Sequence, residues 1–91
     1  MNNVIGMETM ESLSCEHISI PYNGSLEKFL IGRECIIHIL SGKATLVVGG
    51  LNEEQWKYPL DPLNTIHIPP STNFSLLNAG VGALELAFYK L

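Results

Sequence analysis

Short apolar runs, each about the length of one β-strand, follow one another along almost the whole chain. Ile, Val, Leu, Thr and aromatic residues fill these runs, and clusters of Gly, Pro, Asn and Ser interrupt them about every eight to twelve residues. This pattern is typical of an all-β sandwich or barrel, and nowhere does a helical period persist. The expected strands span residues 13–20, 26–31, 34–40, 44–48, 55–60, 65–68, 73–77 and 83–89.

The size and composition of the chain indicate a single small domain that associates with a partner. Its 91 residues leave room for one modest core. Hydrophobic residues make up 46% of the chain and charged residues only 15%, below the roughly 25% that is typical of soluble domains. We therefore expect a homodimer, in which residues 13–91 form a β-barrel and residues 1–12 form an N-terminal arm or flexible segment.

Charge and cysteine usage exclude several classes of protein. The formal net charge is −4, and the five Lys and Arg residues are scattered, so the basic stripe that nucleic-acid binding requires is missing. The chain has two cysteines without C-x-x-C spacing, which indicates reduced thiols rather than a disulfide framework. The N-terminus does not resemble a signal peptide, and no later run could span a bilayer. These observations predict a cytoplasmic protein that binds neither nucleic acid nor membrane.

The segment from Pro69 to Asn78 has the length and the end residues of a known turn motif. It reads Pro-Pro-Ser-Thr-Asn-Phe-Ser-Leu-Leu-Asn, which resembles the second motif of the cupin superfamily, P-x-G-x-x-H-x-x-x-N. Ser71 takes the place of the glycine, and Phe74 takes the place of the metal-binding histidine. The resemblance implies a small double-stranded β-helix, that is, a cupin-like jelly-roll barrel.

The first cupin motif, H-x-H, a spacer, E, a second spacer and G, can be aligned through Gly42. This alignment places Cys35 at the glutamate position. The two histidine positions then fall on Phe29 and Ile31, or on Lys28 and Leu30. A catalytic metal site generally needs about three protein ligands. Because Cys35 is the one remaining candidate, we expect no metal and no cofactor at the family site.

The alternation of side chains along a strand predicts which residues line the barrel. If Cys35 faces inward, Ile37 and Ile39 do so as well, whereas a slip of one residue would bury Glu34 and His38 instead. The apolar set favours the first register. The candidates for an internal ligand pocket are Phe29, Cys35, Ile37, Tyr58 and Phe74.

This register also places His38 and His67 on the outer face. The cupin resemblance implies that the strands carrying them lie side by side, so the two imidazoles are expected to be neighbours. They could form a pH-sensitive contact, or could simply lie within a dimer interface or on a polar face.

The segment 53–58 is expected to combine a loop tip with an apolar strand face. Glu53 and Glu54 are typical of a solvated tip. Trp56 and Tyr58 share one face of a strand, so we expect them to line a cavity, pack in the core or cover an interface.

The substitutions in both motifs favour a function without a metal centre. We expect a metal-free cupin-like domain that acts as a small-molecule binding or assembly module, and a small apolar or sugar-like molecule is the candidate ligand. The alternative is a metal-independent sugar-type epimerase or isomerase, which needs an acid and a base facing one cavity. Glu34, His38 and Tyr58 are the candidates for that chemistry, but the first two face the cavity only in the slipped register. No residue is therefore assigned a catalytic role.

Overall fold

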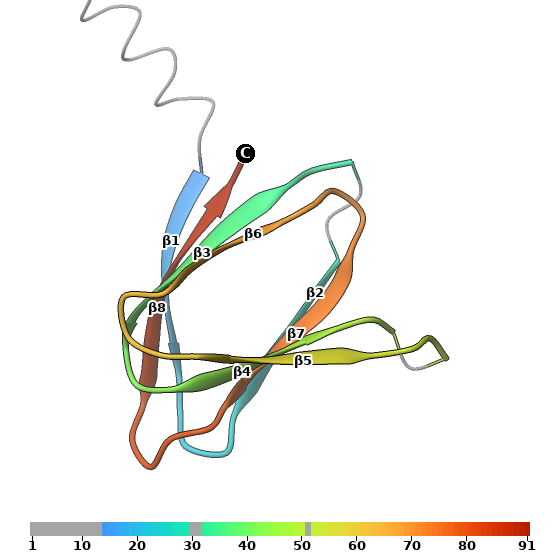
Figure 1. Ribbon diagram of the computed structural model, residues 1–91. Helices are drawn as coiled ribbons and strands as arrows, with labels where there is room; N and C mark the ends of the chain where they lie inside the picture. The colour runs from blue at the N-terminus through green and yellow to red at the C-terminus, as the bar shows by residue number, and fades with distance from the viewer. Residues whose placement is uncertain (1–13, 30–31, 51) are drawn as a thin grey trace, which may run out of the picture.

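The computed structural model describes residues 14–29, 32–50 and 52–91, and within these ranges the chain is all-β (Figure 1). Its strands are β1 (Ser14–Ile20), β2 (Ser25–Phe29), β3 (Cys35–Ser41), β4 (Ala44–Val48), β5 (Trp56–Leu60), β6 (Thr65–Ile68), β7 (Asn73–Asn78) and β8 (Leu84–Lys90). All the expected strands are confirmed. The expected arm at 1–12, together with residues 13 and 30–31 of two expected strands, lies outside the described residues.

The strands form two four-stranded antiparallel sheets that face each other as a jelly roll. One sheet has the order β1-β8-β3-β6, and the other has the order β2-β7-β4-β5. Figure 1 shows the two sheets as layers, with the chain passing from one to the other at most of its turns. The expected jelly-roll architecture is confirmed. No helix in the described ranges is long and apolar enough to cross a membrane.

Burial along β3 confirms the register with the inward cysteine. Cys35 is 1% exposed, and Ile37 and Ile39 are 0% exposed. His38 lies opposite Thr65 of β6 and is hydrogen-bonded to it on the outer side of the sheet. Both sheets contribute to one core, whose buried members are Ile20, Cys35, Ile37, Ile39, Ala44, Leu46, Leu60, Ile68, Phe74, Leu76, Leu84, Leu86 and Phe88.

The side chain of Asn78, which ends the turn motif, ties separate segments of the chain together. Its Nδ2 atom donates to the carbonyl oxygens of Ile20, Pro21 and Gly82, at 3.0, 3.1 and 2.8 Å. Its Oδ1 atom accepts a hydrogen bond from the backbone amide of Gly80 at 2.9 Å. One amide therefore holds the β1–β2 turn against the β7–β8 loop, which explains why an asparagine stands here.

Ser71, at the glycine position of the motif, keeps the backbone conformation that a glycine would favour. Its φ is 56°, in the left-handed region that residues with a side chain rarely adopt. Its hydroxyl oxygen accepts a hydrogen bond from the backbone amide of Gly32 at 2.9 Å. This bond joins the β6–β7 turn to the loop before β3 and offsets part of the backbone strain.

We expect Asn78→Ala to lower the free energy of unfolding by about 2–4 kcal/mol, because several backbone groups lose their partner at about 1 kcal/mol each. Asn52→Ala, at an exposed loop position outside this network, should change the free energy by less than about 0.5 kcal/mol. Urea titrations followed by fluorescence and circular dichroism measure both values. Equal stability of the two variants would show that the hydrogen bonds of the Asn78 side chain do not stabilise the fold.

Candidate functional site

Three of the positions that the motif alignment assigns to metal ligands, Lys28, Cys35 and Phe74, come together inside the barrel. Lys28 of β2 lies directly opposite Phe74 of β7, so both side chains share the inward face. Phe74 is 4% exposed, and the Lys28 ammonium lies 5.5 Å from the centre of the buried Phe88 ring, within the range of a cation–π contact. Of the residues that the two alignments of the first motif assign to histidine positions, Lys28 therefore faces into the barrel, and Leu30 and Ile31 lie outside the described residues.

These groups do not suit a divalent cation. The ring of Phe74 and the ammonium of Lys28 offer no electron pair to a metal. Burial raises the pKa of the Cys35 thiol above its usual value, and the charge of Lys28 counteracts this only in part, so the thiol stays protonated at neutral pH. In the part of the chain that the structure describes, no group of three or more His, Cys, Asp or Glu side chains could hold a metal ion.

The residues expected to line an internal pocket occupy several different environments. Cys35 and Ile37 are packed within the core, and Phe74 reaches from the core to the edge of a surface cleft. Tyr58 is 45% exposed on β5. Phe29 ends β2, but its side chain lies outside the described part of the chain. Ligand binding by this set of residues stays a prediction.

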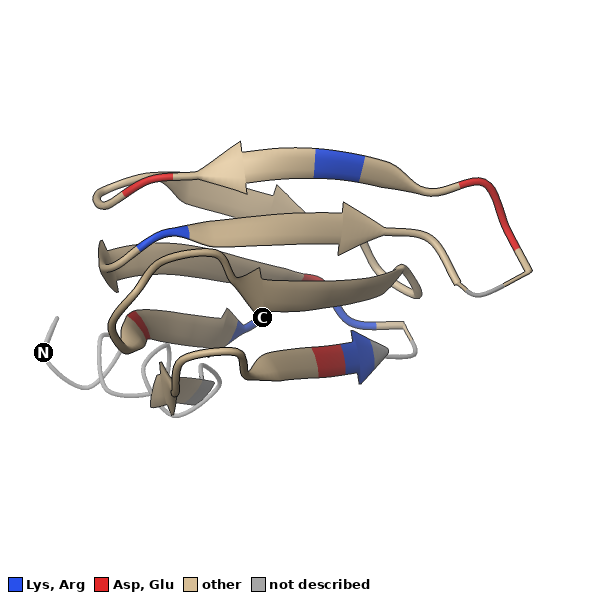
Figure 2. Ribbon diagram, turned by 90° about the horizontal axis from the view of Figure 1, so that it is seen from below, with Lys and Arg blue, Asp and Glu red and all other residues tan. Residues whose placement is uncertain are grey.

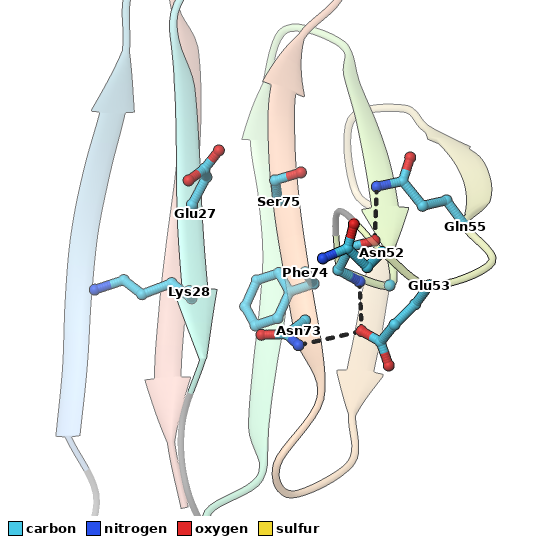
Figure 3. A pocket seen from close by; sticks show the side chains of 10 residues that line it. Glu27, Lys28, Asn52, Glu53, Gln55, Asn73, Phe74 and Ser75 are labelled. Carbon is cyan, nitrogen blue, oxygen red and sulfur yellow. Dashed lines mark hydrogen bonds between the residues drawn. The ribbon is translucent and has the colours of Figure 1, made fainter.

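An open cleft of about 580 Å³ lies at one end of the β2-β7-β4-β5 sheet, between β2, β7 and the β4–β5 hairpin (Figure 3). Most of its polar groups are hydroxyls, amides and carboxylates, from Ser75, Asn52, Gln55 and Glu27 among others. Figure 3 shows the Lys28 side chain directed away from the β4–β5 hairpin, so its charge does not lie near the hairpin loop. Such a lining suits a ligand that forms many hydrogen bonds.

Glu53 shapes the hairpin loop that forms one wall of this cleft. Its Oε1 atom accepts hydrogen bonds from the Gly50 amide at 2.7 Å and from Asn73 Nδ2 at 3.3 Å (Figure 3). Gly49 has a φ of 119°, and a Cβ there would lie 2.5 Å from the Glu54 carbonyl oxygen, so the bend requires glycine. The tip is exposed as expected, but nothing in the sequence indicated that Glu53 fastens it to β7.

The inward face of β5 is left uncovered along most of the strand. Trp56 and Tyr58 lie opposite Val48 and Leu46 of β4, so their rings belong to the core-facing side of the sheet. Leu60, at the far end of β5, is 7% exposed, whereas Tyr58 is 45% and Trp56 52% exposed. Figure 1 shows β5 and β6 diverging from their common loop. We call the exposed inward surface that Trp56 and Tyr58 form the open side of the sandwich.

His38 and His67 lie on the outer face of neighbouring strands, as expected. They do not face each other directly, because each lies opposite another residue and has its own partner. His38 Nδ1 is 2.7 Å from Thr65 Oγ1, and His67 Nε2 is 3.0 Å from Glu34 Oε2. The pair therefore consists of two separate polar contacts on one exposed surface.

The acid–base set required for isomerase chemistry is not assembled. Glu34 and His38 are held on the outer face of one sheet by their partners. Tyr58 lies on the inward face of the other sheet. These side chains cannot face one cavity, so the geometry gives no support to the enzymatic alternative.

We expect the two cysteines to differ strongly in reactivity. Cys15 is exposed, whereas Cys35 is buried and its pKa is raised, so a thiol reagent should modify one group rapidly in the native protein and the second only after unfolding. Titration with a chromogenic disulfide, with and without guanidinium, measures this. Cys15→Ala should abolish the rapid phase and Cys35→Ala the phase that needs unfolding. Two rapid thiols in the native wild type would contradict the packed interior.

No protein-family model and no curated protein sequence matches the chain. Solved structures do match it. Drosophila melanogaster CENP-C bound to CAL1 is similar over 85% of this chain and 63% of that chain, at 14% identity and a TM-score of 0.76. The Schizosaccharomyces pombe Cnp3 cupin domain is similar over 86% of this chain and 54% of that chain, at 16% identity and a TM-score of 0.75. Recombinant oxalate oxidase in complex with glycolate is similar over 86% of this chain and 41% of that chain, at 13% identity and a TM-score of 0.73.

These likenesses show that the chain has the fold of cupin domains, as its two motifs implied. The identities of 16% or less concern the fold alone. The chain spans between 41% and 63% of the lengths of the three matching chains. The function must therefore be argued from the surfaces and groups of this chain.

Proposed function

We propose that this cupin-like domain is a homodimeric assembly module that works without a metal ion. The observation that carries the proposal is the open side, where Trp56 and Tyr58 are 52% and 45% exposed on the inward face of a sheet. Rings in this position gain most from being covered by another surface, because Trp and Tyr contribute large buried areas at the centres of interfaces. A second copy of the chain supplies that cover.

The groups at the motif positions support a function that does not use the barrel interior. Phe74 and Cys35 are packed among apolar side chains, and Lys28 places an ammonium over the Phe88 ring. None of these groups can activate water or bind a divalent cation at neutral pH. We therefore place the function on the outside of the sandwich.

Association with another protein also occurs among the similar structures. CENP-C, which shares this fold, was solved bound to CAL1. From this we carry over only the kind of function, which is contact with another protein chain. The partner itself is not carried over, since the likeness concerns the fold.

Sedimentation velocity at micromolar concentration should give twice the 10.0 kDa mass of one chain. Elemental analysis of the purified protein should find no iron, nickel or zinc in stoichiometric amount, because the inward groups offer no ligand set. A monomer at every concentration would refute the homodimer. A stoichiometric metal that survives purification and stabilises the fold would refute the metal-free interior.

The cleft supports a second candidate function, the binding of a small sugar-like molecule. Its volume of about 580 Å³ is sufficient for such a ligand. Hydroxyl, amide and carboxylate groups of Ser75, Asn52 and Glu27 could each bond a sugar hydroxyl. Because Glu53 already fastens the hairpin to β7, one wall of the cleft is formed before any ligand binds.

We expect a neutral mono- or disaccharide at saturation to raise the melting temperature by about 2 °C or more. Ser75→Ala and Asn52→Ala should reduce this rise, because they remove groups that line the cleft but lie outside the Glu53 contacts. Ser25→Ala, on the same strand as Glu27 but outside the cleft, is the control. A sugar panel without any effect, or an equal effect in all three variants, would refute this candidate.

A further inference from the structure

We propose that the homodimer forms where two β5 edges meet side by side around a two-fold axis at Pro59, so that each copy covers the open side of the other. This inference rests on the homodimer proposed above, and it adds the surface and the register of the contact. Three features of the surface support it: the free edge of β5, the charges along that edge and the apolar residues beside these charges.

β5 is an edge strand, paired with β4 and without a second neighbour among the described strands. Apart from Leu60, all its residues are exposed. An uncapped edge of this kind invites contact with another chain. Pro59, the fourth of the five residues of β5, has no backbone N–H group, however, so it interrupts a continuous hydrogen-bonded ladder along the edge. The contact must therefore be made mainly by side chains.

The charges along this edge complement a second copy of themselves. Figure 2 shows one basic segment within β5 and acidic segments in the loops at both ends of the strand. Lys57 and Asp61 lie equally far from Pro59 on either side, and within the described ranges neither forms an ion pair. An antiparallel contact centred on Pro59 places Lys57 of one copy beside Asp61 of the other, and the two-fold axis repeats this pair.

Of the two acidic residues at the other end of β5, Glu53 is a weaker counter-charge for Lys57 than Asp61 is. Glu53 already accepts hydrogen bonds from Gly50 and Asn73 within its own chain. The carboxylate of Asp61 has no such bond among the described residues, where only the backbone of Asp61 is engaged, with Asn64. The carboxylate of Glu54 has no such bond among the described residues either, but a contact that paired it with Lys57 would be centred between Gln55 and Trp56 and would leave the exposed Leu63 outside. The register centred on Pro59 includes Leu63 and is therefore favoured.

The same register brings apolar surfaces together. Trp56 of one copy falls beside Pro62 of the other, and Leu63, which is 76% exposed, follows at the next position. Tyr58 lies next to the axis and therefore close to Tyr58 of the second copy. The contact thus has Tyr58 next to its centre, a Lys57–Asp61 pair on each side of it, and Trp56 with Pro62 outside each pair. Aromatic side chains of this kind contribute strongly to interfaces.

Truncation tests the aromatic part of this contact. Trp56→Ala and Tyr58→Ala should each raise the dimer dissociation constant by about tenfold or more in sedimentation experiments. Tyr22→Ala is the matched control, because Tyr22 is 61% exposed but lies in the β1–β2 turn. Trp56 is the only tryptophan of the chain, so its emission should shift to longer wavelength as the wild-type dimer dissociates on dilution. Unchanged emission across that dissociation would overturn the inference.

Charge exchange tests the register. Lys57→Glu and Asp61→Lys each set like charges against one another at both flanks, so each variant alone should associate about tenfold or more weakly than the wild type. An equal mixture of the two variants restores opposite charges at both flanks and should form a heterodimer. Lys43→Glu, in the β3–β4 turn, is the control and should leave the dissociation constant unchanged. Circular dichroism verifies that every variant is folded.

These outcomes separate the surface from the dimer itself. A wild-type chain that sediments as a monomer overturns both the homodimer and the β5 contact. A wild-type dimer that tolerates both aromatic truncations overturns the β5 contact and leaves the homodimer standing. The same conclusion follows if the mixed charge variants associate no better than either variant alone.

Discussion

Burial of one side of β3 is the constraint from which most of the architecture follows. Cys35, Ile37 and Ile39 face inward together because side chains alternate along a strand, and the residues between them must then face outward. β3 pairs with both β6 and β8, so its register fixes the registers of its neighbours. A chain of this size has a single core, and a slip by one residue would turn the whole apolar row toward water.

This local alternation explains why the strands and the inward positions of Cys35 and Phe74 could be predicted from the sequence. The shared face of Trp56 and Tyr58 was predicted as well, but its exposure could not be, because both residues follow the same alternation as the buried Leu60. They are exposed because β5 diverges from the opposite sheet. The cleft likewise depends on a contact between Glu53 and a residue 20 positions away in sequence, which no local pattern encodes.

The fold can lose the chemistry of its interior and keep its shape because the two depend on different atoms. Backbone carbonyls bonded to Asn78 and the left-handed backbone of Ser71 hold the turns. Metal ligands would instead be inward side chains, and these can be exchanged for apolar groups such as Phe74 with a gain in packing. Lys28 is the exception, and its contact with Phe88 gives the charge a partner inside the barrel.

The pairing of β1 with β8 joins Ser14 to Lys90, almost the full length of the described chain. β8 is the one neighbour that β1 has among the described strands. During synthesis on the ribosome, Ile18 and Ile20 must therefore wait without their partner strand until β8 has emerged. Closing so long a loop is entropically unfavourable and makes folding slow. The interval before closure is when a newly made chain is most exposed to aggregation and to chaperones.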